Sequence, residues 1–200
     1  MKLKIALALA AVLLITNLFA FDGKRKGFIL GFGVGTSTLT YKQRVETNTG
    51  IFTSPEIKES PIVTDFKIGY APDNSLELYY SSKVAWFSMI NAYEDKVSVT
   101  DGVGTISASF FFLSDSNSNV WSASPFFSFG FGFSSWSTPE LQDSPSWIGI
   151  GFFAGGGYEF AKHFRAELNF FMNNPSHSEG GIQASTDSSA IMLTINAMAF

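Results

Sequence analysis

The chain has 200 residues, a formal net charge of −4 and no cysteine. A net negative charge leaves no electrostatic footprint for nucleic acid, and the lack of cysteine excludes disulfides, thiolate chemistry and cysteine metal sites. Phenylalanine is over-used at 22 residues while only 15% of residues are charged, so any charged site is sparse.

The first 20 residues, MKLKIALALAAVLLITNLFA, predict a secretory signal peptide that is cleaved after Ala20. Two lysines precede a short apolar run and a small residue follows it, which is the order found in signal peptides. The run is too short for a comfortable transmembrane helix of about 20 apolar residues, and an uncleaved anchor is the alternative. Residues 21–200 then form one exported domain with a formal charge of −6, because the leader carries two lysines and no acid.

The rest of the sequence alternates apolar and polar residues with a period of two, which predicts strands and no helix. The clearest segment is SPFFSFGFGFSSW at 124–136, where phenylalanine recurs at every second position with serine or glycine between. Because a strand points successive side chains to opposite faces, this segment has one phenylalanine face and one face of small residues. The predicted strands are 27–42, 62–70, 75–87, 103–113, 122–136, 147–160, 163–173 and 189–200.

The breaks between these strands alternate in length. Three are short (71–74, 114–119 and 161–163) and four are long and polar (44–60, 89–101, 137–146 and 174–188). Eight strands with short periplasmic turns and longer extracellular loops predict an all-β fold, a closed antiparallel up-and-down transmembrane β-barrel. Closure removes sheet edges and satisfies every backbone group, as lipid requires.

The alternation divides the side chains into a lipid-facing set and a lumen set. The lipid-facing candidates are Phe127, Phe129, Phe131, Phe133, Ile148, Ile150, Phe152, Leu168 and Phe170. The lumen candidates, which should form ion pairs because an unpaired buried charge is costly, are Asp65, Lys67, Glu77, Lys83, Glu159, Arg165 and Glu167. Hairpin register predicts Lys67 with Glu77 and Glu159 with Arg165. Such an interior is a rigid plug, or alternatively an ion-pair gate that opens a small pore.

Large aromatic residues are sorted to the strand ends, which predicts two girdles. The loop-side girdle comprises Trp86, Trp136 and Trp147, and the turn-side girdle comprises Tyr70, Trp121, Tyr158, Phe160, Phe164 and Phe200.

This layout, the girdles and the ending IMLTINAMAF resemble the small eight-stranded outer-membrane β-barrels of the OmpA/OmpX type. The resemblance implies a Gram-negative-type outer membrane, its lipid as a partner, and barrel-assembly machinery that reads the last strand through Phe200. Ile191, Leu193 and Ile195 lie on the face opposite to Phe200, so the orientation of that strand stays open.

Three other motifs are weaker. GIGFFA at 149–154 matches a dinucleotide-binding pattern but lies inside an alternating strand, so no cofactor is expected. His177, Ser178 and Glu179 have the residue types of lipid A-modifying barrel enzymes, but not their spacing, and consecutive residues do not converge. Several acids could bind a divalent cation, but acidic residues in outer loops are ordinarily part of the solvated surface. They are Glu46, Glu56, Glu59, Glu94, Asp95 and Asp101.

The expected function is therefore a structural or surface-interaction barrel, with an extracellular ligand possible through the loops. A small-solute or ion channel is the alternative, and a lipid-modifying enzyme is the third reading. No catalytic, cofactor or metal site is predicted.

Overall fold

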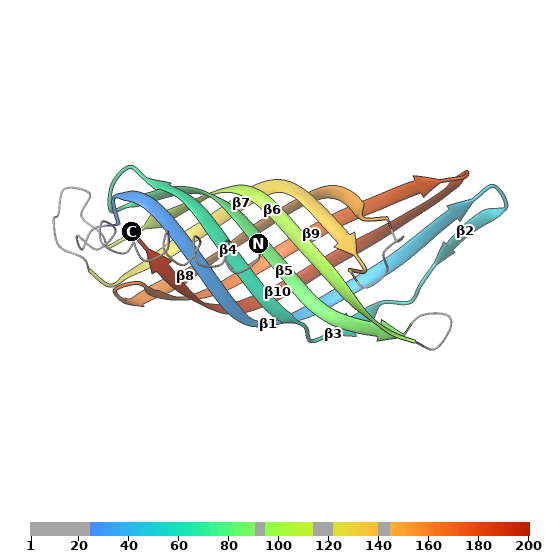
Figure 1. Ribbon diagram of the computed structural model, residues 1–200, viewed down its shortest axis with the longest axis horizontal. Coiled ribbons are helices and arrows are strands. Elements are labelled where there is room, and N and C mark those ends of the chain that lie inside the picture. The colour runs from blue at the N-terminus through green and yellow to red at the C-terminus, as the bar shows by residue number, and fades with distance from the viewer. Residues whose placement is uncertain (1–24, 91–94, 114–121, 140–144) are drawn as a thin grey trace, which may run out of the picture.

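The computed structural model describes residues 25–90, 95–113, 122–139 and 145–200. It is all-β and antiparallel, as predicted (Figure 1). Within the described ranges no helix has the length and apolar character needed to cross a membrane. The strands are β1 (Gly27–Thr47), β2 (Gly50–Thr53), β3 (Ile57–Glu59), β4 (Ile62–Ala71), β5 (Leu76–Ile90), β6 (Lys96–Phe111), β7 (Ser124–Ser137), β8 (Trp147–Ala161), β9 (Phe164–Glu179) and β10 (Ile182–Ala199).

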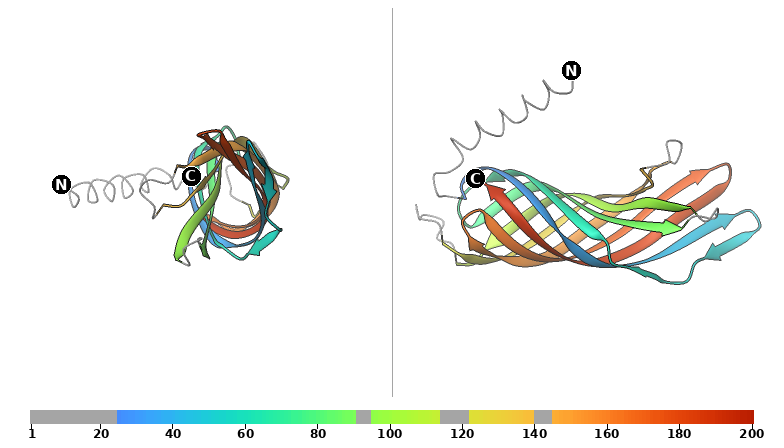
Figure 2. Two further views of the ribbon diagram at one scale, coloured as in Figure 1. Left: turned by 90° about the vertical axis from the view of Figure 1, so that its right-hand side faces the viewer. Right: turned by 60° about the horizontal axis from the view of Figure 1, so that its bottom comes forward.

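Eight of these strands close into a ring. Neighbours pair in the order β10-β9-β8-β7-β6-β5-β4-β1, and β10 also pairs with β1 over a long register from Leu30↔Ala199 to Glu46↔Gln183. The end-on view in Figure 2 shows the closed ring. Among the described strands, β2 and β3 are short and pair only with β1.

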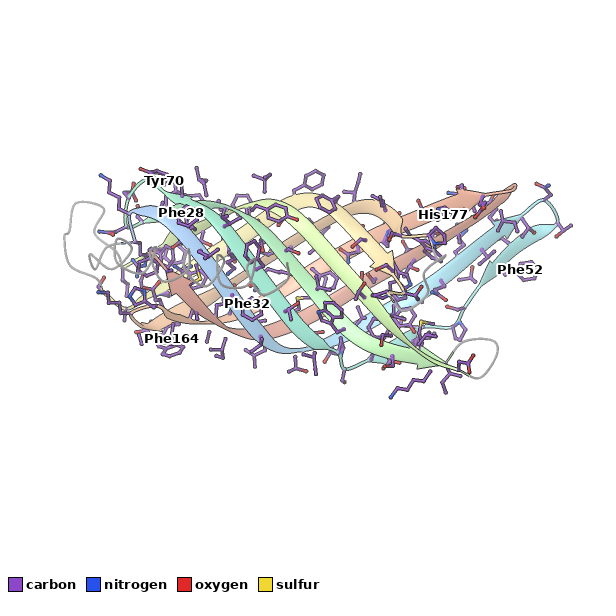
Figure 3. All side chains as sticks on the ribbon, viewed as in Figure 1. Phe28, Phe32, Phe52, Tyr70, Phe164 and His177 are labelled. Atoms are coloured by element: carbon purple, nitrogen blue, oxygen red, sulfur yellow. The ribbon has the colours of Figure 1, made fainter. Side chains whose placement is uncertain are left out.

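Alternation sorts the side chains between the outside and the inside of the ring. In β7, Phe129 and Phe131 are exposed on the outside, whereas Ser128 and Ser134 are fully buried inside. Figure 3 shows the same outward direction for Phe28, Phe32 and Phe164. All nine residues predicted to face lipid are exposed on the outside.

The strands run farther than the alternation of apolar residues indicated. The predicted long loop at 174–188 is wrong, because β9 and β10 form a hairpin that turns at Gly180 and Gly181, with φ of 58° and 82°. Likewise β1 extends to Thr47, and β6 begins at Lys96 inside the predicted loop 89–101. Residues 43–47 and 176–185 are exposed or half-buried on both faces, so their composition resembles that of a loop while their backbones stay paired. The added part of β6 instead buries Val97, Val99 and Asp101 on its inner face.

The extended strands form a sheet that projects beyond one end of the ring. Pairing of β1 with β4 ends at Thr36↔Ile62, but pairing of β1 with β10 continues to Glu46↔Gln183. β2 pairs with the far part of β1, and β9 pairs with the far part of β10. We call these far parts of β2, β1, β10 and β9 the projecting sheet, which lies at the right of Figure 1.

The opposite end of the ring carries the short turns and both described chain ends. In the β4–β5 turn, the Asp73 carboxylate accepts hydrogen bonds from Ser75 Oγ at 2.6 Å, the Ser75 amide at 2.7 Å and the Leu76 amide at 3.1 Å. These bonds, the Ser75 hydroxyl first, hold the pKa of Asp73 below its usual value.

The last strand has one orientation. Ile191, Leu193 and Ile195 are exposed on the outside, while Met198 and Phe200 are buried inside. The Phe200 ring packs against His163, with 5.0 Å between the centroids. Phe200 is therefore an interior residue and not part of a turn-side girdle.

Candidate functional site

The chemistry of this chain is concentrated inside the ring. All seven predicted lumen residues are buried, each with at most 1% of its surface exposed. Two further charged side chains, Arg25 and Asp101, are buried with them. Eight of these nine charges form two networks.

The first network, which we call the arginine network, comprises Arg25, Arg165, Glu77 and Glu159. Arg165 makes a two-bond contact with Glu77, in which Nη1 donates to Oε2 at 2.7 Å and Nη2 donates to Oε1. Glu159 Oε2 accepts from Arg25 Nε at 3.0 Å and from Arg165 Nε at 3.1 Å. The predicted pair Glu159–Arg165 is therefore present. Two cations and two acids make the network neutral.

The second network, the lysine network, comprises Lys67, Lys83, Asp65 and Glu167. Lys67 Nζ donates to Glu167 and lies 3.5 Å from Asp65 Oδ2, while Lys83 Nζ donates to Asp65 Oδ2 at 2.6 Å. The predicted pair Lys67–Glu77 is wrong. Glu77 is drawn to Arg165, because a guanidinium fork matches both carboxylate oxygens and an ammonium does not.

Aromatic and apolar residues enclose both networks. The guanidinium of Arg25 lies 4.2 Å from the Phe111 ring centroid, and Lys83 Nζ lies 4.7 Å from that of Phe153. A buried apolar cluster closes the turn side: Ile29, Ala71, Tyr79, Met198 and Phe200. A larger one fills the loop side: Leu39, Tyr41, Val63, Ala85, Val97, Val99, Val103, Trp136, Phe153, Phe171, Ala190 and Met192.

Sequence reasoning missed Arg25 because it precedes the first predicted strand. Its side chain nevertheless follows the inward alternation of Ile29, so extending that alternation towards the N-terminus identifies it. Arg25 also donates from Nη1 to the Asn74 carbonyl at 3.0 Å and from Nη2 to the Ser122 carbonyl at 2.7 Å. It therefore ties the arginine network to the turn end of the ring.

The predicted girdles are only partly where they were expected. Trp86, Tyr70 and Tyr158 are exposed outside. Trp136 is buried inside, with 5.1 Å between its centroid and that of Tyr41, and Trp147 packs against the same interior cluster. These two tryptophans do not belong to a lipid-facing girdle, because they share the inward alternation of their strands. Trp121 lies outside the described residues.

The remaining candidates stay apart. His177 and Glu179 share one face of β9, with 3.5 Å from Nε2 to Oε2, while Ser178 points to the other face, so no triad converges. Segment 149–154 is the middle of β8, without a phosphate-binding turn.

The acidic candidates form no shared cation site. Among the residues the structure describes, no group of three or more acidic, histidine or cysteine side chains is arranged for a metal ion. Glu46 and Glu56 pair with Arg44 and Lys42 on the surface. Asp101 is buried and not in a loop, and Glu94 lies outside the described residues.

Comparison with known proteins bears on architecture alone. No family model and no curated protein matches the sequence. Among solved structures, the chain is similar to Ail of Yersinia pestis, crystallised with the heparin analogue sucrose octasulfate (14% identity, TM-score 0.46, covering 86% of this chain and 99% of Ail).

It is also similar to the outer membrane protein OprG of Pseudomonas aeruginosa (10% identity, TM-score 0.49, 88% and 98% covered). A third is the outer membrane protein AlkL in DMPC bilayers (9% identity, TM-score 0.47, 86% and 90% covered). The barrel architecture itself follows from the chain's own strand pairings: an antiparallel ring of eight strands, as in small OmpA/OmpX-type barrels.

Proposed function

We propose that the protein is an integral outer-membrane barrel with a sealed interior, whose role is to present the projecting sheet outside the cell. The observation that carries the proposal is the neutrality of the two networks. Each pairs two cations with two acids and is enclosed by apolar clusters. Such an interior rigidifies the ring and offers no row of like charges to guide an ion.

The outer surface supports insertion into lipid. Apolar side chains that a soluble protein would bury are exposed around the ring, among them Phe32, Phe131, Ile150 and Leu193. A closed ring leaves no backbone edge within the membrane.

The projecting sheet supports a surface-interaction role. Within the described residues, β2 ends the sheet order and pairs only with β1, so its outer edge there is available to another strand. Ile51 and Phe52 are more than half exposed, and Figure 3 shows Phe52 at the far end of the molecule. An extended edge with exposed apolar side chains fits a protein partner outside the cell.

Thiol labelling tests which end of the barrel lies outside the cell. Because the chain has no cysteine, Phe52→Cys and Lys162→Cys each introduce a single thiol, at the projecting sheet and in the β8–β9 turn, where Lys162 is exposed. A membrane-impermeant maleimide should label the Phe52→Cys variant on intact cells. It should label the Lys162→Cys variant only after the outer membrane is permeabilised, and equal labelling of both variants on intact cells contradicts the orientation.

Conductance tests the sealed interior. The refolded barrel should pass no steady current in planar bilayers, because both networks are neutral and enclosed. Steady single-channel conductance contradicts the sealed interior and supports the channel reading.

A further inference from the structure

Asp101 is the one of the nine buried charges described above that belongs to neither network. It lies on β6, is fully buried, and forms no salt bridge with any residue in the described ranges. Its Oδ1 accepts a hydrogen bond from Asn173 Nδ2 at 2.7 Å, but its Oδ2 has no partner in that part of the chain. A half-satisfied buried carboxylate is costly, so it calls for a compensating positive charge.

Further unpartnered oxygens lie along the inner faces of β9 and β10, beginning beside this carboxylate. Within the described structure, Asn173 Oδ1, Ser188 Oγ and Thr186 Oγ1 are buried without a hydrogen bond. Ser188 lies opposite Asn173 in the β9–β10 pairing and interacts with the Asp101 carboxylate without a well-formed hydrogen bond. Thr186 is two residues farther along the same inner face of β10. We call Asp101, Asn173, Ser188 and Thr186 the oxygen cluster.

A cavity reaches two members of the oxygen cluster, Asn173 and Ser188, from the outer surface. The β9–β10 ladder runs from Ser185↔Ser176 directly to Ser188↔Asn173, because Pro175 has no N–H to donate at the skipped step. A cavity of about 480 Å³ lies there, and its walls include the buried Asn173 and Ser188. Its outer wall carries the charged residues Lys42, Glu56 and Asp187 beside the exposed apolar residues Ile150, Phe152 and Met172.

We propose that the oxygen cluster binds a monovalent alkali cation, sodium or potassium, which enters through this cavity. Oxygen-only ligands suit hard cations rather than transition metals. One carboxylate balances one positive charge, whereas a divalent ion leaves a net charge beside the apolar loop-side cluster. The inference goes beyond the surface role proposed above and does not depend on whether the barrel conducts.

The test compares unfolding midpoints of the refolded full-length mature chain in urea at pH 7, in sodium, potassium or choline chloride at equal ionic strength. Equal ionic strength removes general screening as an explanation, and choline is too large for the cluster. The wild-type midpoint should rise with sodium or potassium relative to choline, because a ligand that binds only the folded state stabilises it. Asp101→Asn should abolish the difference, and Asp187→Asn on the outer wall of the cavity should retain it.

If Asp101→Asn does not refold, the test uses Thr186→Val and Ser188→Ala instead, because both variants keep the carboxylate. Each should weaken the apparent cation affinity by about tenfold, the effect of losing one neutral oxygen ligand. The broadening of the sodium NMR line should be largest with the wild-type barrel and smaller with each of these two variants.

Three results overturn the proposal: a wild-type midpoint that is the same in all three salts, a sodium effect that persists in Asp101→Asn, or an effect of calcium that exceeds that of both alkali cations at equal ionic strength. A midpoint that ignores the salt but falls as pH rises through the weakly acid range, only when Asp101 is present, also overturns it and assigns the carboxylate a proton instead.

Discussion

Removing Lys67 tests whether the lysine network stabilises the barrel as a unit. Lys67 is fully buried and contacts both Glu167 and Asp65. In Lys67→Met two acids share Lys83, which lies 2.6 Å from Asp65 and 3.7 Å from Glu167. Leaving a buried acid without its partner costs about 3–5 kcal/mol. With a urea dependence of about 1–3 kcal/mol per molar, the unfolding midpoint should fall by roughly 1 M or more.

Lys42→Met is the matched control, because its 3.5 Å pair with Glu56 is about half exposed at both ends. An exposed pair contributes about 0–1 kcal/mol, so this midpoint should barely move. The double variant Lys67→Met/Glu167→Gln removes both partners and should recover much of the loss. Equal midpoints for the two single variants, measured by tryptophan fluorescence in the same vesicles, would refute the reasoning. So would a double variant that is less stable than Lys67→Met.

Three further predictions concern the two faces of β7, the space at interior glycines and the β4–β5 turn. Phe129→Arg places a charge on the exposed outer face and should cost about 2–4 kcal/mol in bilayers, whereas Ser128→Arg acts inside, through packing and charge. Gly130→Ala should cost about 1–3 kcal/mol, because its Cβ would meet buried side chains at 2.6 and 2.7 Å. Gly102→Ala should cost less, because the atom nearest to its Cβ would lie 3.3 Å away. Asp73→Ala should be destabilising at neutral pH. Since the hydrogen bonds lower the folded-state pKa of Asp73 from 3.8, its contribution is present above that value and disappears as pH falls through the folded pKa.

Each of these has a measurement that can contradict it. Unfolding in vesicles of two thicknesses should distinguish the arginine variants, and an identical thickness response contradicts the assignment of Phe129 to the outside and Ser128 to the inside of β7. Equal midpoints for the two glycine variants contradict the packing argument. A stability difference between wild type and Asp73→Ala that stays constant from neutral pH down to acid pH contradicts the role given to the turn hydrogen bonds.

Alternation along the chain was enough to predict the fold class, the strand count of the ring and the direction of most side chains. These follow from a period of two, which is a property of each strand alone. The same rule predicts that Trp136 and Trp147 lie inside. The girdle prediction was wrong for these two tryptophans because it considered their position along the strand and ignored their alternation. Continuing the rule by one step to Arg25 finds the eighth network charge.

Which charges pair, where the strands end and what Asp101 contacts became known only from the folded ring. Pairing depends on distances across the ring, between residues as far apart in sequence as Glu77 and Arg165, which hairpin register cannot supply. Strand ends were obscured because paired strands in water are as polar as loops. The surroundings of Asp101 required β6, β9 and β10 to meet inside one ring, and closure of that ring is a property of all eight strands together.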